Sequence, residues 1–295
     1  MENKPLPQFI KDQIPSGIES KYIDVDGFSI HYLEKGKGIP VFMMHGNPTW
    51  SFLYRNIMNE LDPEIYHCIA PDLPGLGFSS KPDSPNFHTL GNHQNIITSF
   101  LNKVIDQDFI FVGQDWGGPI GLLASMNNKF KMKGMVLLNT MIRPPKKDFK
   151  PTLFHSFSRI PLLSDVVFRV AGFPQKYLGM VQGDKKSIKG EVSKAYSWPL
   201  KDLNSNQAPL LLSRMVPNNH DHPSVKYLKM TEEFASAYTG PVSIFWGKKD
   251  PVLGRLSSAH HNLMPHAKLT ITDGGHFIQE EYPKLIAEEI KSLKI

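Results

Sequence analysis

The 295-residue chain contains a single cysteine, Cys68, so an intramolecular disulfide and a cysteine-based metal site are both excluded. It has no dense stripe of Lys and Arg with interleaved aromatic residues, which argues against nucleic-acid binding although the formal net charge is +5. The first residues lack the apolar core of a signal peptide, and no apolar run is long enough to cross a bilayer. These absences predict a soluble, cytoplasmic protein with no nucleic-acid partner and no membrane partner.

Apolar runs that are typical of buried strands alternate along the chain with segments of helical spacing. This alternation predicts an α/β fold with a mostly parallel sheet and helices on both faces. Residues 20–26 and 28–34 lie on either side of Gly27 and predict a hairpin. The other predicted strands are 39–44, 66–70, 108–112, 134–139, 241–246 and 268–272, and the predicted helices are 50–61, 90–104, 117–126 and 283–294.

The alternation stops between residues 141 and 229. This stretch is rich in Pro, Lys, Ser and Asn, and its apolar clusters, such as Leu210-Leu211-Leu212, have helical spacing. A chain of 295 residues can be one α/β fold with an insertion. We therefore predict a core domain made of residues 1–140 and 230–295, with a helical cap domain at 141–229 inserted into it.

Residues 113–117 read Gly-Gln-Asp-Trp-Gly, the spacing of the strand-to-helix turn on which α/β-hydrolases hold their nucleophile. A lone Gly-x-Asp-x-Gly is weak evidence, because Asp and Gly are common in ordinary turns. Here a predicted strand precedes the motif, and small residues suited to a closely packed helix follow it. Asp115 stands where esterases carry Ser. A carboxylate with a reference pKa of about 4 is ionised at pH 7. It can therefore attack a saturated carbon and form an alkyl ester.

An alkyl ester must be hydrolysed, and this step requires a base. His276 follows the last predicted strand, and the ends of strands are where catalytic groups gather in open α/β sheets. Asp250 follows the preceding predicted strand and can orient the imidazole. The chain order Asp115, Asp250, His276 is the nucleophile–acid–histidine order of α/β-hydrolases.

Asn47 and Trp116 are the candidate residues for charge stabilisation. Asn47 follows a predicted strand that supplies half of an oxyanion hole in this fold, and Trp116 follows the nucleophile directly. Their backbone N–H groups could stabilise the tetrahedral intermediate of ester hydrolysis. Their side chains carry further N–H donors, which could bind a departing halide. Core packing is the alternative role for Trp116, and a turn is the alternative for Asn47.

With these motifs the chain resembles the haloalkane dehalogenase family. The matching segments are His45-Gly46-Asn47-Pro48-Thr49-Trp50-Ser51, Gln114-Asp115-Trp116-Gly117-Gly118, Trp246-Gly247-Lys248-Lys249-Asp250 and Gly275-His276-Phe277. The resemblance implies that Asp115 is the nucleophile, His276 the base, and Asn47 and Trp116 the halide donors. It also implies hydrolysis of haloalkanes to alcohol and halide through a covalent intermediate.

The position of the triad acid separates members of this family. Some carry Glu after the strand ending near Asn139, but neither Asn139 nor Thr140 is acidic here, so Asp250 is the better match. An Asn halide donor with the acid after the later strand resembles the third dehalogenase subfamily. That subfamily includes β-lactone decarboxylases, so the motifs leave the substrate open. The cap has no motif that matches.

Three other functions remain open. An epoxide hydrolase would use the same Asp–His–Asp set with cap tyrosines as acids, and Tyr177, Tyr196 and Tyr227 lie in or near the cap. A β-lactone decarboxylase would open a ring, giving carboxylate and then CO₂. A non-catalytic ligand-binding homologue would keep the pocket alone. In each case we expect a small apolar ligand (haloalkane, epoxide or β-lactone) and, for the dehalogenase, a halide ion.

The remaining motifs predict no cofactor and no metal. Residues 72–79 are rich in glycine but fail the dinucleotide pattern, because Ser80 stands where its third Gly should be. The run His220-Asp221-His222 precedes Pro223, so we expect a turn there. The pair His260-His261 is expected on an exposed helix.

Overall fold

Eight strands form one sheet in the computed structural model, which describes residues 5–146 and 152–293. Their order is β1-β2-β4-β3-β5-β6-β7-β8, with parallel pairing from β4 through β8 and antiparallel pairing of β1 with β2 and of β2 with β4. The prediction of a mostly parallel sheet is thus confirmed. The strands are β1 (Glu19–Val25), β2 (Phe28–Lys35), β3 (Ile39–Met44), β4 (Tyr66–Pro71), β5 (Phe109–Asp115), β6 (Met132–Thr140), β7 (Val242–Gly247) and β8 (Lys268–Thr272).

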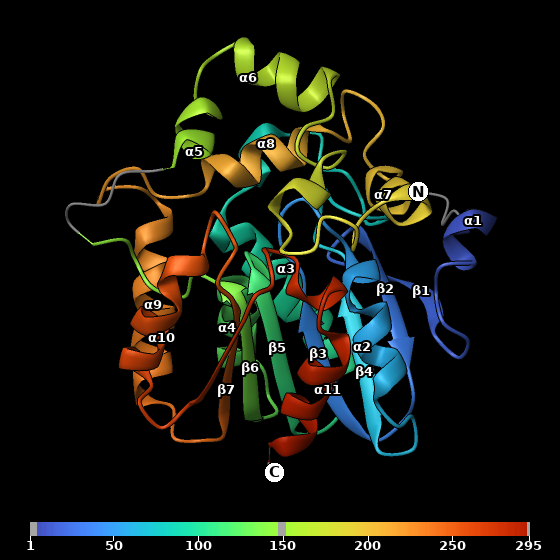
Figure 1. The fold of residues 1–295 in the computed structure, drawn as a ribbon, viewed down its shortest axis with the longest axis vertical. Helices are drawn as coiled ribbons and strands as arrows, with labels where there is room; N and C mark the ends of the chain where they lie inside the picture. The colour runs from blue at the N-terminus through green and yellow to red at the C-terminus, as the bar shows by residue number, and fades with distance from the viewer. Residues whose placement is uncertain (1–4, 147–151, 294–295) are drawn as a thin grey trace.

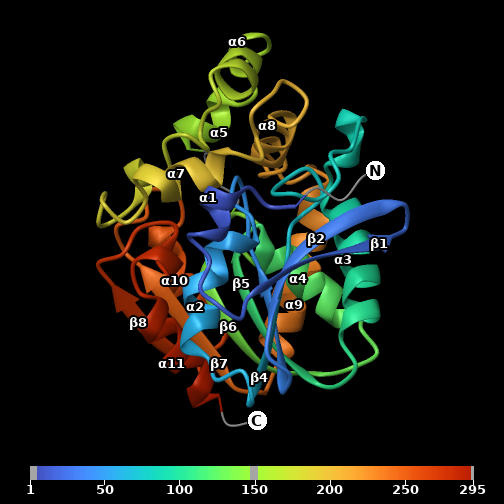
Figure 2. The same cartoon turned by 90° about the vertical axis from the view of Figure 1, so that its right-hand side faces the viewer.

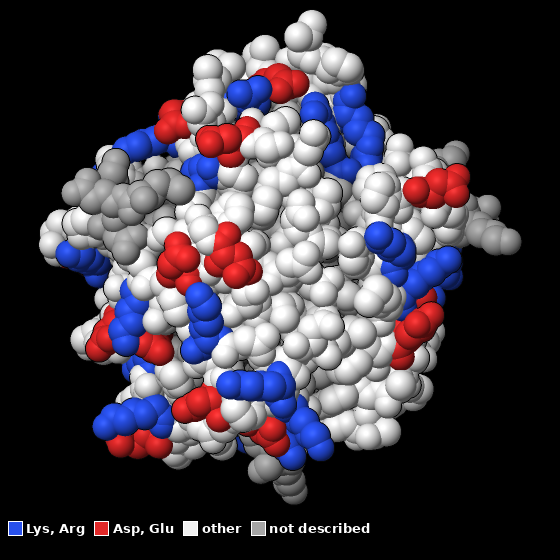
Figure 3. All heavy atoms as spheres, turned by 180° about the vertical axis from the view of Figure 1, so that it is seen from behind, with Lys and Arg blue, Asp and Glu red and all other residues white. Residues whose placement is uncertain are grey.

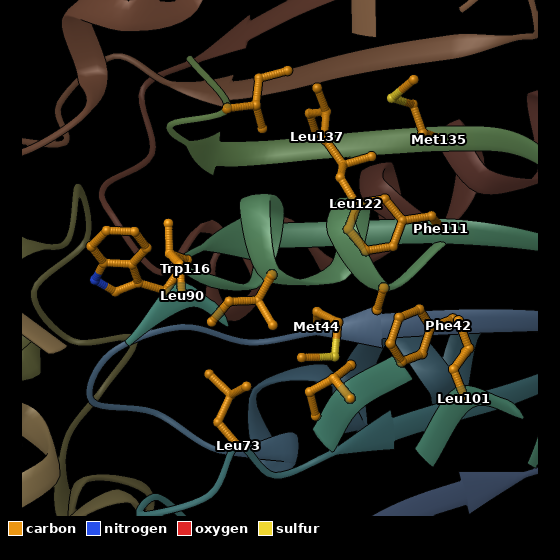
Figure 4. Packing of buried hydrophobic residues seen from close by; sticks show 14 of the residues in the cluster. Phe42, Met44, Leu73, Leu90, Leu101, Phe111, Trp116, Leu122, Met135 and Leu137 are labelled. Atoms are coloured by element: carbon orange, nitrogen blue, oxygen red, sulfur yellow. The ribbon is translucent and has the colours of Figure 1, made fainter. Parts of the chain in front are cut away.

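The central strands are buried on both faces, as parallel strands in a layered α/β fold must be. In β5 every residue before Asp115 is buried, and the residues of β3 after Ile39 are buried as well. Figure 4 shows Phe42, Phe111 and Leu137 of neighbouring strands in one packed row, with Leu122 of a helix lying over them. The continuous apolar runs in the sequence are explained by this burial on two sides.

Helices cover both faces of the sheet, as predicted (Figures 1 and 2). One face carries α3 (Leu90–Val104), α4 (Gly117–Met126), α9 (Ser224–Ala237) and α10 (Ser257–Leu263), and the other carries α1 (Gln8–Lys11), α2 (Arg55–Glu60) and α11 (Pro283–Ser292). The predicted bounds of α3 are confirmed. Its start is fixed by Thr89, whose side chain accepts a hydrogen bond from the backbone N–H of Asn92.

Short helices from the middle of the chain lie over one end of the sheet (Figure 1). They are α5 (Leu153–Phe157), α6 (Leu163–Asp165), α7 (Gly190–Ser197) and α8 (Gln207–Arg214), with η3 (Val166–Val170) continuing α6. We call residues 152–223 the cap segment. The boundary that we predicted at 229/230 falls inside α9, which packs against α4 and α3 on the core side. The core therefore resumes near Ser224, because a helix packs as one unit.

Two further predictions need adjustment. The strand predicted at 108–112 extends to Asp115 itself, so the candidate nucleophile is the last residue of β5. The helix predicted at 50–61 is divided into a 3-10 turn, Ser51–Tyr54, and α2. Cys68 is buried in β4. No helix among the described residues has the length and apolar character needed to cross a membrane.

Candidate active site

The turn between β5 and α4 holds Asp115 at a sharp bend. Its φ is 49°, in the left-handed region that residues other than glycine rarely adopt. The turn packs closely against β3, because a Cβ at Gly117 would lie 2.1 Å from the backbone oxygen of Met44. The hydroxyl of Thr140 donates a hydrogen bond of 2.7 Å to the backbone oxygen of Asp115. The bend therefore fixes the carboxylate at the edge of the sheet.

The Asp115 carboxylate is held by backbone groups. The N–H of Asn47 donates to its Oδ1 at 2.8 Å, and the N–H of Trp116 also donates to the carboxylate. Gly46 permits this approach, since a Cβ there would lie 2.2 Å from Oδ1. Burial raises the pKa of Asp115, and the charge of His276 and the two N–H donors oppose that rise. Two backbone N–H groups directed at one carboxylate have the arrangement of an oxyanion hole.

His276 lies between the two aspartates. Its Nδ1 hydrogen-bonds Asp250 Oδ2 at 2.8 Å, and its Nε2 lies 3.6 Å from Asp115 Oδ2, beyond hydrogen-bonding distance. Gln114 donates from Nε2 to the backbone oxygen of His276 at 3.2 Å and so helps to fix the ring. Burial lowers the pKa of His276, but the charge and hydrogen bond of Asp250, with the charge of Asp115, raise it overall. The imidazole is placed to take a proton from a water beside Asp115.

Asp250 is buried in the loop after β7 and is well provided with donors. Asn139 Nδ2 donates to Asp250 Oδ2 at 2.7 Å, and the N–H of Val252 donates to Oδ1 at 2.7 Å. Burial raises the pKa of Asp250, but His276 and these donors lower it overall, so the carboxylate stays ionised. The role of Asn139 in holding Asp250 is a finding of the structure, since the sequence predicts only that Asn139 is not the acid. The one sequence signal for this contact is the place of Asn139 near the end of β6, which pairs with β7.

The side-chain donors expected to bind halide already have partners. Asn47 Nδ2 donates to the backbone oxygen of Pro209 at 3.0 Å and to Ser213 Oγ at 3.1 Å. Trp116 Nε1 donates to the backbone oxygen of Leu212 at 3.0 Å. All three acceptors belong to α8. In this structure the two side chains therefore have no N–H group left for an anion while α8 holds this position. Their role as halide donors stays a prediction.

A cavity of about 900 Å³ lies between the sheet edge and the cap segment, and Asp115, Trp116 and His276 line it. Most of its wall is apolar, with Met141, Phe173 and Leu178 among the contributors. Its volume is near the upper end of the range for small-molecule sites. An apolar cavity excludes water and strengthens the electrostatic interactions of the groups that line it.

The three cap tyrosines have different environments. Tyr177 lines the cavity, whereas the Tyr196 hydroxyl is buried against Glu280, which also pairs with Arg55. Tyr227 does not line the cavity, and its hydroxyl lies beside Gly91 of α3. A pair of cavity tyrosines, as an epoxide hydrolase would need, is therefore not formed by these three residues.

His155 of α5 lines the cavity and was missed by sequence reasoning. Its Nδ1 hydrogen-bonds Thr152 Oγ1 at 2.7 Å, which fixes the ring. Burial lowers its pKa to about 4, with the charges of Arg159 and His276 adding to the effect, so the ring is neutral at pH 7. The sequence offered no signal for it, because a histidine inside a short helix is more often a packing residue.

Other histidines behave as structural residues. His260 is fully buried in α10 beside Trp246, so the expectation of an exposed position is wrong for it. Its Nε2 accepts from the backbone N–H of Ile142, an interaction that depends on packing between distant segments. Residues 220–222 lie in a turn, as expected. The part of the chain that the structure describes has no cluster of His, Cys, Asp and Glu able to hold a metal.

A family model described as "alpha/beta hydrolase fold" matches residues 39–283, which is most of the chain. The chain belongs to the α/β-hydrolase family. Like the fold and the bend at Asp115, this membership agrees with the prediction made from residues 113–117.

The relatives of this α/β-hydrolase include haloalkane dehalogenases and an oxetanone decarboxylase. The chain is 27% identical to haloalkane dehalogenase 2 of Mycobacterium bovis, over 92% of the chain and 93% of the relative. It is 28% identical to the cis-3-alkyl-4-alkyloxetan-2-one decarboxylase of Shewanella oneidensis, over 92% of the chain and 86% of the relative. The solved haloalkane dehalogenase DbeA of Bradyrhizobium elkani superposes with a TM-score of 0.84 at 24% identity, covering 94% of this chain and 99% of that one. The resemblance to haloalkane dehalogenases is thus confirmed, together with the similarity to a β-lactone decarboxylase.

Proposed function

We propose that this α/β-hydrolase hydrolyses a carbon–halogen bond at saturated carbon, with Asp115 as nucleophile, His276 as base and Asp250 as the acid that orients it. The observation that carries the proposal is the alignment of Asp115 and His276 at the wall of an apolar cavity, with Asp250 buried behind the imidazole. The products are an alcohol and a halide ion. The names of the relatives support a small apolar substrate.

The two oxygens of Asp115 take different roles in this proposal. Oδ2 faces His276 and attacks the substrate carbon, which releases halide and leaves an alkyl ester. Oδ1 stays on the backbone N–H of Asn47. Water then attacks the carboxyl carbon, and the charge that develops on Oδ1 is stabilised by the N–H groups of Asn47 and Trp116.

Alkylation also prepares the base. The Asp115 charge is one of the causes that raise the pKa of His276, and the ester carries no charge. The pKa of His276 should therefore fall once the ester has formed. A neutral imidazole is then available to take the proton of the attacking water, while Asp250 stabilises the resulting cation.

The leaving group is the least constrained part of this proposal. A halide can bind Asn47 and Trp116 only if their side chains give up the acceptors of α8, so α8 must move. Because α8 already accepts hydrogen bonds from these N–H groups, a second candidate reaction is favoured, the opening of a β-lactone. This reaction releases no free halide and needs no halide site. After Asp115 attacks the ring carbon, the leaving carboxylate remains part of the alkyl group. Loss of CO₂ from it, with formation of a C=C bond and cleavage of the bond between that carbon and Asp115, then gives an alkene and regenerates the Asp115 carboxylate. His155 is a cavity residue beside which that carboxylate could lie.

The deciding experiment compares haloalkanes, epoxides and β-lactones with wild-type protein and the Trp116→Phe variant. Dehalogenation predicts halide release, an alkyl mass on the Asp115 peptide, and saturable quenching of tryptophan fluorescence by bromide. Trp116→Phe should lose the quenching and slow halide release by about ten- to a hundredfold, because a hydrogen bond to an ion is worth about 1.5–3 kcal/mol.

The control is Trp198→Phe, which makes the same change at the end of α7, away from the cavity lining. It should leave the rate unchanged. Normal turnover of β-lactones by Trp116→Phe, with no halide binding by wild-type protein, would transfer the function to the second candidate. The proposal places the enzyme in the cytoplasm, which cell fractionation would test.

A further inference from the structure

Exposed apolar side chains are concentrated in the cap segment. Among the described residues, nine of the 13 large apolar side chains that are exposed lie between residues 153 and 203. They are Leu153, Ile160, Leu162, Leu163, Val166, Val170, Tyr177, Met180 and Leu203. A soluble monomer rarely exposes so many such residues in one region unless the region binds something.

The helix formed by α6 and η3 turns an apolar face to solvent. Leu162, Val166 and Val170 recur at every fourth residue, and their side chains are 82%, 55% and 65% exposed. We call these three residues the tip face. The inward side of the same helix carries Ser164 and Phe168, which are buried. Figure 1 shows α6 at the top of the molecule, at the end farthest from the C-terminus and clear of the sheet.

The apolar surface continues from the exterior into the cavity that contains Asp115. Leu153, Tyr177 and Met180 are exposed, and all three also line the cavity. We call these residues the apolar rim. A ligand that leaves an apolar phase against the rim could enter the cavity without first being solvated by water. The continuity links the surface to the proposed substrate, which is itself apolar.

The charge of the same region indicates what covers it. The cap segment, residues 152–223, contains nine Lys and Arg against five Asp and Glu, a net charge of +4, and so carries most of the formal charge of +5 of the whole chain. Exposed lysines near the rim include Lys176, Lys185, Lys186 and Lys189. Figure 3, which views the molecule from behind, shows uncharged spheres at the top, with both blue Lys and Arg and red Asp and Glu close below them.

A second copy of this chain fits the surface poorly. Two caps face to face would bring two regions with a net charge of +4 together, and like charges repel. An anionic lipid surface offers both complements, since lysines are attracted to its headgroups and an apolar helix face enters the boundary of its acyl chains.

We propose that the tip face and the exposed lysines near the rim dock on an anionic lipid surface, and that the cavity receives apolar substrate from that surface across the rim. The second half of this inference rests on the proposed function, whereas the docking does not. The expectation of no membrane partner came from the lack of a long apolar run. That lack bears on spanning a bilayer and not on binding to its surface.

The test is flotation of the full chain with vesicles. Vesicles of equimolar phosphatidylcholine and phosphatidylglycerol are compared with vesicles of phosphatidylcholine alone, at low and high salt. Wild-type protein should bind the anionic vesicles at least tenfold more strongly, and salt should weaken the binding. The triple variant Leu162→Ser, Val166→Ser, Val170→Ser should lose binding at least tenfold.

A matched triple variant, Ile65→Ser, Ile271→Ser, Leu285→Ser, removes three apolar residues of similar exposure from the core and should bind like wild type. Both triple variants should turn over a short, water-soluble substrate at the wild-type rate, which excludes a folding defect, because none of these six residues lines the cavity. With a long-chain substrate presented in anionic vesicles, only the tip variant should slow.

Three results would overturn the proposal: no binding of wild-type protein to anionic vesicles, equal binding of the two triple variants, or a wild-type dimer in sedimentation that the tip variant dissolves. The Asp115→Ala protein separates membrane docking from the proposed reaction. It should bind vesicles like wild type while showing no turnover, so docking can stand or fall independently of the reaction.

Discussion

The sheet and the cap segment use apolar residues in opposite ways. In β5 and β6 the apolar side chains are buried, as Phe111 and Leu137 illustrate, and the polar residues at the strand ends hold one another. In the cap segment the inward side chains, such as Phe168 and Tyr196, are buried as well, but Leu162 and Val170 face outward. The apolar side chains of the sheet are therefore buried within the fold itself. Those on the outer face of the cap would be buried only by a binding partner.

This difference separates chemistry from access. Asp115, Asp250 and His276 are all held by strand ends or the loops that follow them, so their geometry is as rigid as the sheet. The cap segment contributes part of the cavity wall through short helices. One of them, α8, also supplies the oxygens that accept hydrogen bonds from the side chains of Asn47 and Trp116. Rigid elements suit the positioning of reacting groups, and short exposed elements suit the admission of ligand.

The largest expected effect tests whether chemistry resides at the sheet edge. Asp115→Ala removes the attacking oxygen and should lower turnover on the order of 10⁴-fold or more, with no alkyl mass on the enzyme. Steady-state kinetics and mass spectrometry measure both. Tyr177→Phe in the cap is the comparison and should retain most activity with haloalkanes. An equal loss in Tyr177→Phe would place the chemistry in the cap.

The next effect separates the two chemical steps. His276→Gln should still be alkylated and then stall, because only ester hydrolysis needs the base, and turnover should fall about 10²- to 10⁴-fold. Intact-mass measurement after substrate addition should show the alkyl adduct accumulating on Asp115. If the variant loses turnover without any adduct, His276 acts before alkylation and its assignment as base for the second step is wrong.

A third pair of variants compares stability in the two regions directly. Leu137→Ala in β6 empties a fully buried position and should lower the free energy of unfolding by about 2–5 kcal/mol. Leu162→Ala makes the same change on the exposed tip face and should alter it by less than about 0.5 kcal/mol. Urea titration measures both. Similar losses would mean that the tip face is packed in solution.

A smaller effect is expected at Asn139, which sharpens the role of the sheet edge. Asn139→Ala removes the 2.7 Å hydrogen bond to Asp250, and a hydrogen bond to a charged group is worth about 1.5–3 kcal/mol. Ester hydrolysis should slow by roughly tenfold or more, while alkylation in a single turnover should not. The exposed Asn102→Ala is the control and should match wild type. Unchanged ester hydrolysis in Asn139→Ala would show that Asp250 needs no support.

The smallest effect is a shift in pH dependence. His276 acts as base only when neutral, so ester hydrolysis should be lost as the pH falls through its pKa. In the free enzyme, Asp250 and Asp115 raise that pKa above its usual value. The ester removes the Asp115 charge, so hydrolysis of the trapped ester should titrate at a lower pH than the free-enzyme imidazole observed by NMR. Coincident values would show that Asp115 does not influence His276.

The fold could largely be predicted, because its signals are local. The apolar runs predicted the strands, and the helical spacing of residues 90–104 predicted α3. The chain order of Asp115, Asp250 and His276 suggested a common site, and the structure brings the three side chains together. Their roles remain predictions.

Other features depend on packing between distant segments. The acceptors of α8 on Asn47 and Trp116, the burial of His260 and the cavity position of His155 all result from how the cap and core meet. No pattern of spacing within one segment encodes such a meeting, because the partners are far apart in sequence. The predicted boundary at 229/230 is a related case, since it falls inside α9, and only packing between distant segments associates this helix with α3 and α4.

The hold of α8 on Asn47 and Trp116 makes anion binding and cap position two sides of one equilibrium. A halide and α8 compete for the same N–H groups, so the apparent dissociation constant of halide equals its intrinsic value divided by the fraction of molecules in which α8 has withdrawn. By linkage, a substitution that weakens α8 should tighten halide binding by the same factor by which it populates the withdrawn state. The bromide dissociation constant would then report the fraction of molecules in which α8 has withdrawn.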